Sequence, residues 1–272
     1  MSKPKLAGFP NENDGDGRYY TNPITKERLP SVTSVLRMAD KSQLTQWAVN
    51  LSVDWAVNNL DILSTMDVKR GGNMARYKWK DFRDERAQTG TGIHDTVEAE
   101  HTGSWEYPVL DDEQKLIMRE WRKLNEKHDI KPIFSEFTVW NPGIAAGTAD
   151  GYWTIDGVPC LVDIKTSKNT WPEHMYQLAA LWKSPIRMEE YELDKWREVD
   201  APQYDRVVLV HLRAPVFNEY GYETESGKHD IIEVHDLEEN YRAFKAYADV
   251  WQAKQDLKVL TKKREAAQFG GF

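Results

Sequence analysis

The chain has 272 residues, and its 36 lysines and arginines against 44 aspartates and glutamates give a formal net charge of −8. Hydrophobic residues make up 40% of the sequence, which excludes a disordered chain and is enough for the core of one large domain or two small ones. The single cysteine, Cys160, excludes an internal disulfide framework, a four-cysteine iron–sulfur site and a cysteine-rich zinc module.

Location and partners are limited by the same properties. The sequence has no apolar run of about 18 residues and no signal-peptide pattern, so we expect no membrane helix and a cytoplasmic protein. The acidic balance argues against binding DNA through net charge alone. It does not exclude a protein whose acidic residues lie in a metal site.

The N-terminal region is expected to contain a leader, a hairpin and a helix. Residues 1–17 end in a polar, glycine-rich stretch and are interpreted as a mobile leader. The segment 18–28 is typical of a short hairpin, and Ser31 or Thr33 can cap a helix that runs towards Met38.

A second helix is expected over 44–60, where apolar side chains recur near the helical period and predict a helical lobe. These side chains are Trp47, Leu51, Trp55 and Leu60. Residues 72–88 interleave basic with aromatic side chains, a mixture that suits a nucleic-acid backbone and stacked bases. The candidate DNA-binding residues are Arg76, Lys80, Arg83 and Arg86. Because Asp81 and Asp84 dilute this charge, a solvated helix face is the alternative.

From residue 89 onward helical and extended patterns alternate, which favours a mixed α/β or α+β fold with a central mixed sheet flanked by helices. Helices are expected after 90–92 and over 111–128 and 172–182, strands at 134–140, 206–212 and 230–234, a hairpin at 145–165, and a last helix from Leu237. The chain is divided into an N-terminal helical region at 1–88, a core at 89–236, and a C-terminal helix with its tail at 237–272.

The last helix carries two apolar stripes. Phe244, Tyr247 and Trp251 predict a core-facing stripe on its first half. The residues expected to continue the stripe on an adjoining face are Val250, Ala253, Leu257 and Leu260.

The most informative segment is 147–165. Asp156-Gly157 separates two apolar-rich runs and predicts a two-residue hairpin turn. Counting outward from that turn gives one wholly apolar face, which includes Cys160 and ends with Ala149 opposite Ile164. Cys160 is therefore expected in the core.

The other face of the hairpin places Asp150 directly opposite Asp163, where paired Cβ atoms are about 4.5–5.5 Å apart. Two like charges there are destabilising unless a positive group lies between them. Lys165 projects from the same face because strand side chains alternate. One interpretation is a lysine that neutralises an acid pair at the sheet surface. The other is a divalent-metal site with hard oxygen ligands for Mg²⁺ or Mn²⁺ and the lysine beside it.

The pattern Gly147-x-x-Asp150, twelve residues, then Asp163-Ile164-Lys165 resembles the bipartite motif of the PD-(D/E)XK nuclease superfamily. Two further segments resemble its RecB-like branch, which includes phage recombination exonucleases: 90–94 ending in a histidine, and 176–180 with its glutamine. The resemblance covers 89–182, about a third of the chain, and implies a restriction-endonuclease-like core.

Carried over residue by residue, the resemblance implies that Asp150, Asp163 and His94 bind the metal together with the backbone carbonyl of Ile164. Lys165 would position or activate the attacking water.

Two further residues are implied by the resemblance. Glu136 lies where members often place an acid on the preceding strand, and Gln177 would help to organise the site. The aromatic residue usual four positions after that glutamine is replaced by Leu181, so an exposed or merely structural Gln177 is an equal alternative.

His94, Glu98 and His101 have the spacing of one helix face, which offers zinc as another interpretation of that histidine. The sequence contains no fourth zinc ligand beside them. The resemblance favours a hard-metal or phosphate-contacting role for His94.

The resemblance implies a Mg²⁺- or Mn²⁺-dependent exonuclease that hydrolyses DNA in recombination, repair or replication in a phage or bacterial context. DNA is the expected substrate. A recombinase, a single-strand-binding protein and further copies of the chain are candidate partners, and a phage-encoded chain would act in the host cytoplasm. An endonuclease of the same superfamily and a non-catalytic DNA-binding module are the alternatives.

Overall fold

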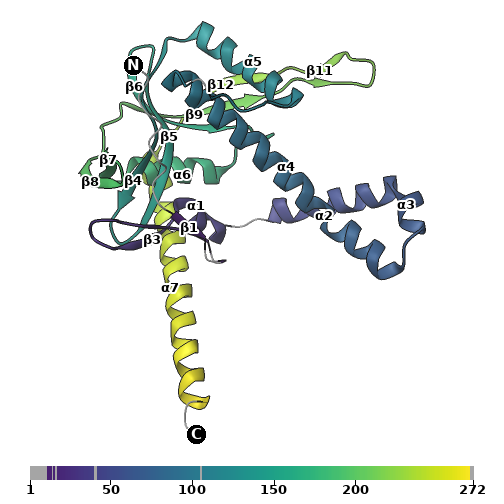
Figure 1. Ribbon diagram of the computed structural model, residues 1–272, viewed down its shortest axis with the longest axis horizontal. Coiled ribbons are helices and arrows are strands. Elements are labelled where there is room, and N and C mark those ends of the chain that lie inside the picture. The colour runs from purple at the N-terminus through teal and green to yellow at the C-terminus, as the bar shows by residue number, and fades with distance from the viewer. Residues whose placement is uncertain (1–10, 14, 16, 40–41, 105, 270–272) are drawn as a thin grey trace.

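The structure is a computed structural model that describes residues 11–13, 15, 17–39, 42–104 and 106–269. A large mixed sheet lies at its centre, covered by helices on both faces (Figure 1). The helices are α1 (Val32–Val35), α2 (Ser42–Asn58), α3 (Leu60–Ser64), α4 (Val68–Thr102), α5 (Asp112–Lys127), α6 (Pro172–Trp182) and α7 (Leu237–Phe269). Among the described helices, none combines the length and the apolar character that crossing a bilayer requires.

Seven strands form the large sheet in the order β12-β9-β6-β5-β4-β7-β8. They are β4 (Ile130–Asn141), β5 (Ala145–Ile155), β6 (Val158–Lys165), β7 (Ile186–Glu192), β8 (Lys195–Asp200), β9 (Arg206–Arg213) and β12 (Lys228–Glu233). β6 and β9 are parallel, whereas the other neighbouring strands of this sheet are antiparallel. A separate short hairpin joins β10 (Val216–Phe217) to β11 (Glu223–Glu225). The predicted mixed α/β class is confirmed.

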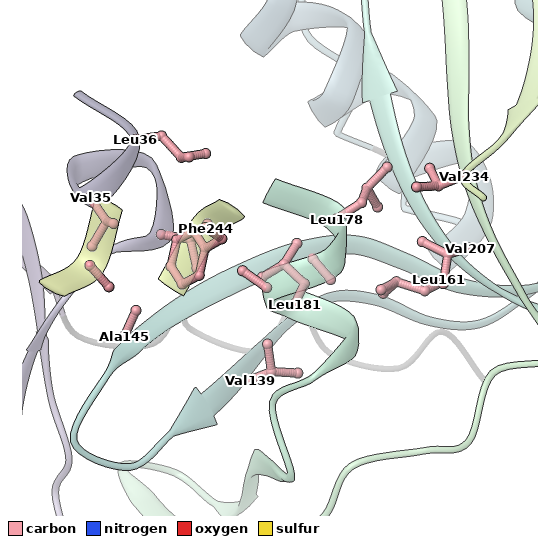
Figure 2. Close-up of a cluster of buried hydrophobic side chains, with 14 of the residues drawn as sticks. Val35, Leu36, Val139, Ala145, Leu161, Leu178, Leu181, Val207, Val234 and Phe244 are labelled. Carbon is pink, nitrogen blue, oxygen red and sulfur yellow. The ribbon is translucent and has the colours of Figure 1, made fainter. Parts of the chain in front are cut away.

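The core lies in two layers, one on each face of the sheet. On one face Ile93 of α4 and Trp121 of α5 share a buried cluster with Trp153 of β5. On the other face Leu178 of α6 and Phe244 of α7 pack with residues of α1 and the sheet (Figure 2). β6 is covered on both faces, which agrees with its nearly continuous apolar run from Val158 to Val162.

A small three-stranded sheet precedes α1. Its strands are β1 (Asn11–Asn13), β2 (Arg18–Thr21) and β3 (Arg28–Pro30). The predicted cap is confirmed, because Ser31 Oγ accepts a hydrogen bond from the Ser34 N–H, and a 3-10 turn extends α1 to Met38. The predicted leader is wrong at 11–13, which pair with β2. Residues 1–10 of that leader lie outside the described residues.

The helical arm formed by α2, α3 and the first half of α4 departs from the prediction. The helix expected over 44–60 is present, but none of the residues of α2 is buried, so the lobe packs along α4 and has no core of its own. α4 begins at Val68 and continues through 90–92, where the sequence pattern predicts the start of a new helix. A Cβ on Gly92 would collide with the Gln114 side chain, so glycine permits the close packing of α4 on α5. The boundary predicted at residue 88 lies inside α4.

The hairpin of β7 and the edge strand β8 occupies a region for which the sequence pattern predicts no element. Their side chains are mostly half-buried or exposed, and Glu189 forms ion pairs with Arg187 and Arg197. An edge hairpin with polar groups on both faces has little of the apolar alternation by which strands are recognised.

Candidate active site

The hairpin that carries the predicted acids is confirmed. Asp156 and Gly157 have φ angles of 53° and 81°, and positive φ at both positions is what a two-residue type I′ turn requires. The predicted register holds for five pairs, from Ile155–Val158 at the turn to Gly151–Val162. Cys160 is fully buried, as expected.

β5 pairs with β6 only from Gly151 to Ile155. At the next residue towards the N-terminus, the side chain of Asp150 takes the place of a backbone carbonyl as the acceptor for β6. The Ile164 N–H donates to Asp150 Oδ2 over 2.6 Å. The prediction that Ala149 shares a face with Ile164 is wrong, since the two belong to clusters on opposite faces of the sheet. The alternation of β5 breaks beside Glu136 of β4, whose φ of 47° lies in the left-handed region. Such strain is concentrated at functional sites.

Asp163 of β6 is only 1% exposed, and its two oxygens have different partners. Gln177 Nε2 of α6 donates to Oδ1 over 2.9 Å, while the Lys165 ammonium forms an ion pair with Oδ2. The interpretation as an acid pair at the sheet surface is therefore wrong for Asp163. An exposed Gln177 is also excluded, because its side chain is half-buried against this carboxylate.

His94 reaches the same site from α4, on the other side of Asp150. Its Nδ1 lies 3.3 Å from Asp150 Oδ1, and the two side chains are 25% and 16% exposed. Asp150 thus connects α4 to the backbone of β6, just before Lys165. Contacts from four elements, α4, β5, β6 and α6, join in one network.

The electrostatics of this network show how its acids stay charged. Burial opposes protonation of His94, but the charge of Asp150 and its hydrogen bond raise the pKa of the ring to about 9. Burial also opposes ionisation of Asp150, yet His94, Lys165 and the Ile164 amide hold its pKa below the usual value. The pKa of Asp163 is raised to about 6, chiefly by burial, and Lys165 only partly offsets this effect. The acids therefore depend on nearby positive charge.

A second group of acids adjoins the network. Asp95 and Glu98 of α4 and Glu136 of β4 each place a carboxylate oxygen within 4.8 Å of the others. Burial, followed by the charges of Glu98 and Asp150, raises the pKa of the Glu136 carboxyl. Glu136 is among the residues predicted from the sequence, whereas Asp95 is not. The i, i+3 spacing of Asp95 and Glu98 on one helix face is the signal that identifies it.

The chemistry of the donors fits a hard divalent cation. Asp163 Oδ2 is buried and makes no hydrogen bond of good geometry with a described residue, so its charge is met only by the Lys165 ion pair. Carboxylate oxygens are the ligands that Mg²⁺ and Mn²⁺ prefer. The contact seen for Ile164 involves its amide, so the role of its carbonyl stays a prediction.

The zinc interpretation of the α4 histidines is not supported by the geometry. The His101 ring lies between Trp121 and Trp153, with ring centroids 5.5 and 4.7 Å away. Burial lowers the pKa of His101 to about 4, and its Nδ1 has no partner among the described residues. His94 instead faces Asp150.

The predicted DNA-binding residues lie on the same helix as His94. A helix turns about 100° per residue, so Arg76, Lys80 and Arg83 lie within about 60° of one another and in line with His94. The three basic side chains are exposed, and the stripe from Arg76 to His94 is about 27 Å long. Arg86 is rotated about 60° away from Arg83. We call Arg76, Lys80 and Arg83 the basic stripe.

Acidic neighbours compensate part of this charge. Asp84 pairs with Arg83 over 2.7 Å, and Arg86 forms an ion pair with an acid of α5. Arg76 and Lys80 form no ion pair with any described residue. These two residues therefore offer the uncompensated positive charge of the stripe.

Comparisons with known proteins leave the family open. No protein-family model matches the sequence, and no curated protein matches it. The chemistry of the site is therefore the basis on which function is inferred.

Proposed function

We propose that the protein is a Mg²⁺- or Mn²⁺-dependent deoxyribonuclease with a restriction-endonuclease-like core, which removes nucleotides from the ends of DNA. One observation carries the proposal. One contact network joins residues of four elements, namely His94, Asp150, Asp163, Lys165 and Gln177. The same residues are those that the superfamily motif marks.

The contacts of each residue define its role. Asp150 and Asp163 would hold the cation together with His94, whose ring would lose its proton when the cation binds. The cation when bound polarises a phosphate oxygen and lowers the pKa of the attacking water. Burial acts against the charged form of Lys165, but Asp163 and Asp150 raise the pKa of its ammonium group. Lys165 therefore stays protonated, and it orients the water and stabilises negative charge on the phosphate as a donor.

The basic stripe supplies a path for the substrate. Arg76, Lys80 and Arg83 lie in line with His94, so a DNA backbone that follows them reaches the acids of the site. Phosphate contacts of this kind position the nucleic acid without reading its sequence. A local basic surface would thus lead the DNA to an acidic reaction centre.

Replacing Asp163 or Lys165 tests the proposal. Asp163→Asn and Lys165→Met should each lower the cleavage rate of linear DNA by about 10²-fold or more, because each removes a positioning charge from the reaction. Asp194→Asn and Lys195→Met make the same chemical changes at an exposed turn and serve as controls. Thermal unfolding verifies that all variants fold. A variant of Asp163 or Lys165 that folds and keeps full activity would overturn the assignment.

Linear and circular DNA substrates distinguish an exonuclease from an endonuclease and from a non-catalytic module. With Mg²⁺ or Mn²⁺ the protein should degrade linear duplexes and spare covalently closed circles. Cleavage of the circle would identify an endonuclease of the same chemistry. No metal-dependent cleavage of either DNA, combined with retained DNA binding, would identify a non-catalytic module.

A further inference from the structure

Two helical surfaces lie outside the core of the described residues, at different ends of the molecule. α2 belongs to the arm that extends from the body, and the second half of α7 extends in another direction (Figure 1). The first half of α7 is anchored in the core by Phe244 and Trp251. Neither projecting segment contributes to the network around Asp163.

The surface on α2 is a groove of about 680 Å³. It extends along α2 from Gln43 to Asn58, a length of about 22 Å, and Asn59 closes its end. The aromatic and aliphatic side chains that line it are Trp47, Leu51, Trp55 and, from α4, Phe82. Asp54 is the charged residue of its lining, and no lysine or arginine occurs in α2 or α3. The other lining residues carry amide side chains, and Lys78 of α4 lies over the ring of Trp55. The groove is therefore an apolar strip with a polar rim, and Asp54 is the acid of its lining.

The surface on α7 is the apolar stripe that the sequence pattern predicts as a continuation of the core. That prediction is wrong, because Val250, Leu257 and Leu260 are 57%, 63% and 49% exposed. Together with Ala253 they are spaced i, i+3, i+7 and i+10, which is how a helix presents one face to a groove. Residues 252–266 carry five lysines and arginines against two acids. The stripe is apolar with basic flanks.

We propose that the second half of α7 of one copy lies in the α2 groove of a second copy. Asp54 is opposite in sign to the net charge of residues 252–266, and this segment is about 22 Å long, close to the length of the groove. Within one copy α7 and the arm that carries α2 extend from the body in different directions, so a second molecule must supply the helix (Figure 1).

The contact joins unlike surfaces, so each copy offers one helix and one groove. Such head-to-tail contacts produce closed rings or open chains, depending on the rotation between neighbours. This arrangement predicts two classes of assembly-defective variant, each damaged on one surface and intact on the other.

The molar mass in solution tests the contact, measured by light scattering on the full chain. The wild type should have a multiple of 31.6 kDa that increases with concentration. Leu257→Asp with Leu260→Asp should reduce the mass to that of one copy. Val259→Asp is the matched control on α7, because Val259 is 52% exposed and lies off the stripe.

The groove is tested in the same way. Leu51→Glu with Asp54→Lys should also give a monomer, because the floor becomes charged and the charge of Asp54 is reversed. The matched control is Val53→Glu with Asp61→Lys, which makes equivalent changes outside the groove lining. Circular dichroism verifies that every variant keeps its helices.

Mixing the two defective variants gives the sharpest result. One variant supplies an intact α7 and the other an intact groove, so the mixture should form a complex of two copies and no larger species. A wild type that is monomeric at roughly 100 μM, a mixture that stays monomeric, or a groove variant that still assembles would each overturn the proposal. The last outcome would indicate pairing of α7 with α7.

Discussion

Asp163 shows how strongly a single buried carboxylate depends on its neighbours. With 1% of its surface exposed, it relies on Gln177 at one oxygen and Lys165 at the other. Burial raises its pKa to about 6 in spite of the lysine, so the carboxylate is only narrowly kept ionised. A buried acid without sufficient positive charge is a costly feature that a bound cation would relieve.

Gln177→Ala should weaken the site without removing a metal ligand. Asp163 Oδ1 would lose its donor, which costs about 1–3 kcal/mol of stability. Removal of such a supporting hydrogen bond should also reduce Mn²⁺ affinity about 10–100-fold. Urea unfolding and calorimetric titration measure the two effects, with Glu173→Ala on the same helix as the control. A change in stability alone, with Mn²⁺ affinity preserved, would show that Gln177 is merely structural.

His101 should make stability fall in mild acid. Burial lowers its native pKa to about 4 from an unfolded value of 6.5, so between these values the unfolded chain binds a proton that the native protein does not. Above about pH 6.5 His101 therefore leaves the free energy of unfolding unchanged. By pH 5 it lowers the free energy of unfolding by about 2 kcal/mol. Glu98 and Glu136 line the same small cavity, but burial is the cause of the shift.

His101→Phe isolates this effect, because phenylalanine fills the apolar position without a titrating group. The difference in unfolding free energy between pH 7 and pH 5 should decrease by about 2 kcal/mol in this variant. His235→Phe, at an exposed position, is the control. Equal pH dependence in His101→Phe and the wild type would contradict the prediction.

Among the secondary-structure elements, α4 has the central role. It is one helix of 35 residues, which begins at the Asp67 cap and ends at Gly103 with a φ of 66°. Its first half forms the arm and carries the basic stripe, and its second half covers the sheet and supplies His94. Because the helix is continuous, the stripe and the site keep a fixed relation to each other.

Arg76→Ala and Lys80→Ala should each weaken DNA binding in a salt-dependent way. Each phosphate that no longer meets a basic side chain should reduce the slope of log affinity against log salt concentration by about 1. Lys78→Ala, on the opposite face and paired with Asp81, is the control. Fluorescence anisotropy at several salt concentrations measures the slope, and an unchanged slope in both stripe variants would place the DNA elsewhere.

Across the molecule as a whole, the net charge of −8 conceals an uneven distribution. Acids gather at the network and beside it, while basic groups gather on the stripe of α4 and at the end of α7. Net charge therefore says little about partners, because binding depends on local fields. The projecting arm and α7 give the molecule two separate surfaces, so the proposed self-association would depend on the whole molecule and not on one helix.

Several features of this protein follow from local rules and can be predicted along the chain. Asp156-Gly157 specifies a turn, and a period of two then sets the register as far as Gly151 opposite Val162. The predicted pairing of Asp150 with Asp163 lies beyond this register, and Asp150 instead accepts from the Ile164 amide. The helix at 172–182 and the start of the last helix at Leu237 also agree with the structure. These features depend on neighbours in the chain, so the sequence pattern is sufficient to predict them.

Other features depend on tertiary packing. Whether Gln177 meets Asp163, and whether Asp95 and Glu98 meet Glu136, depends on how helices from distant parts of the chain pack on the sheet. The apolar stripe on α7 looks the same in the sequence whether it is buried or exposed. Its exposure depends on where the body of the protein ends, because burial is a property of the packed molecule and not of the helix.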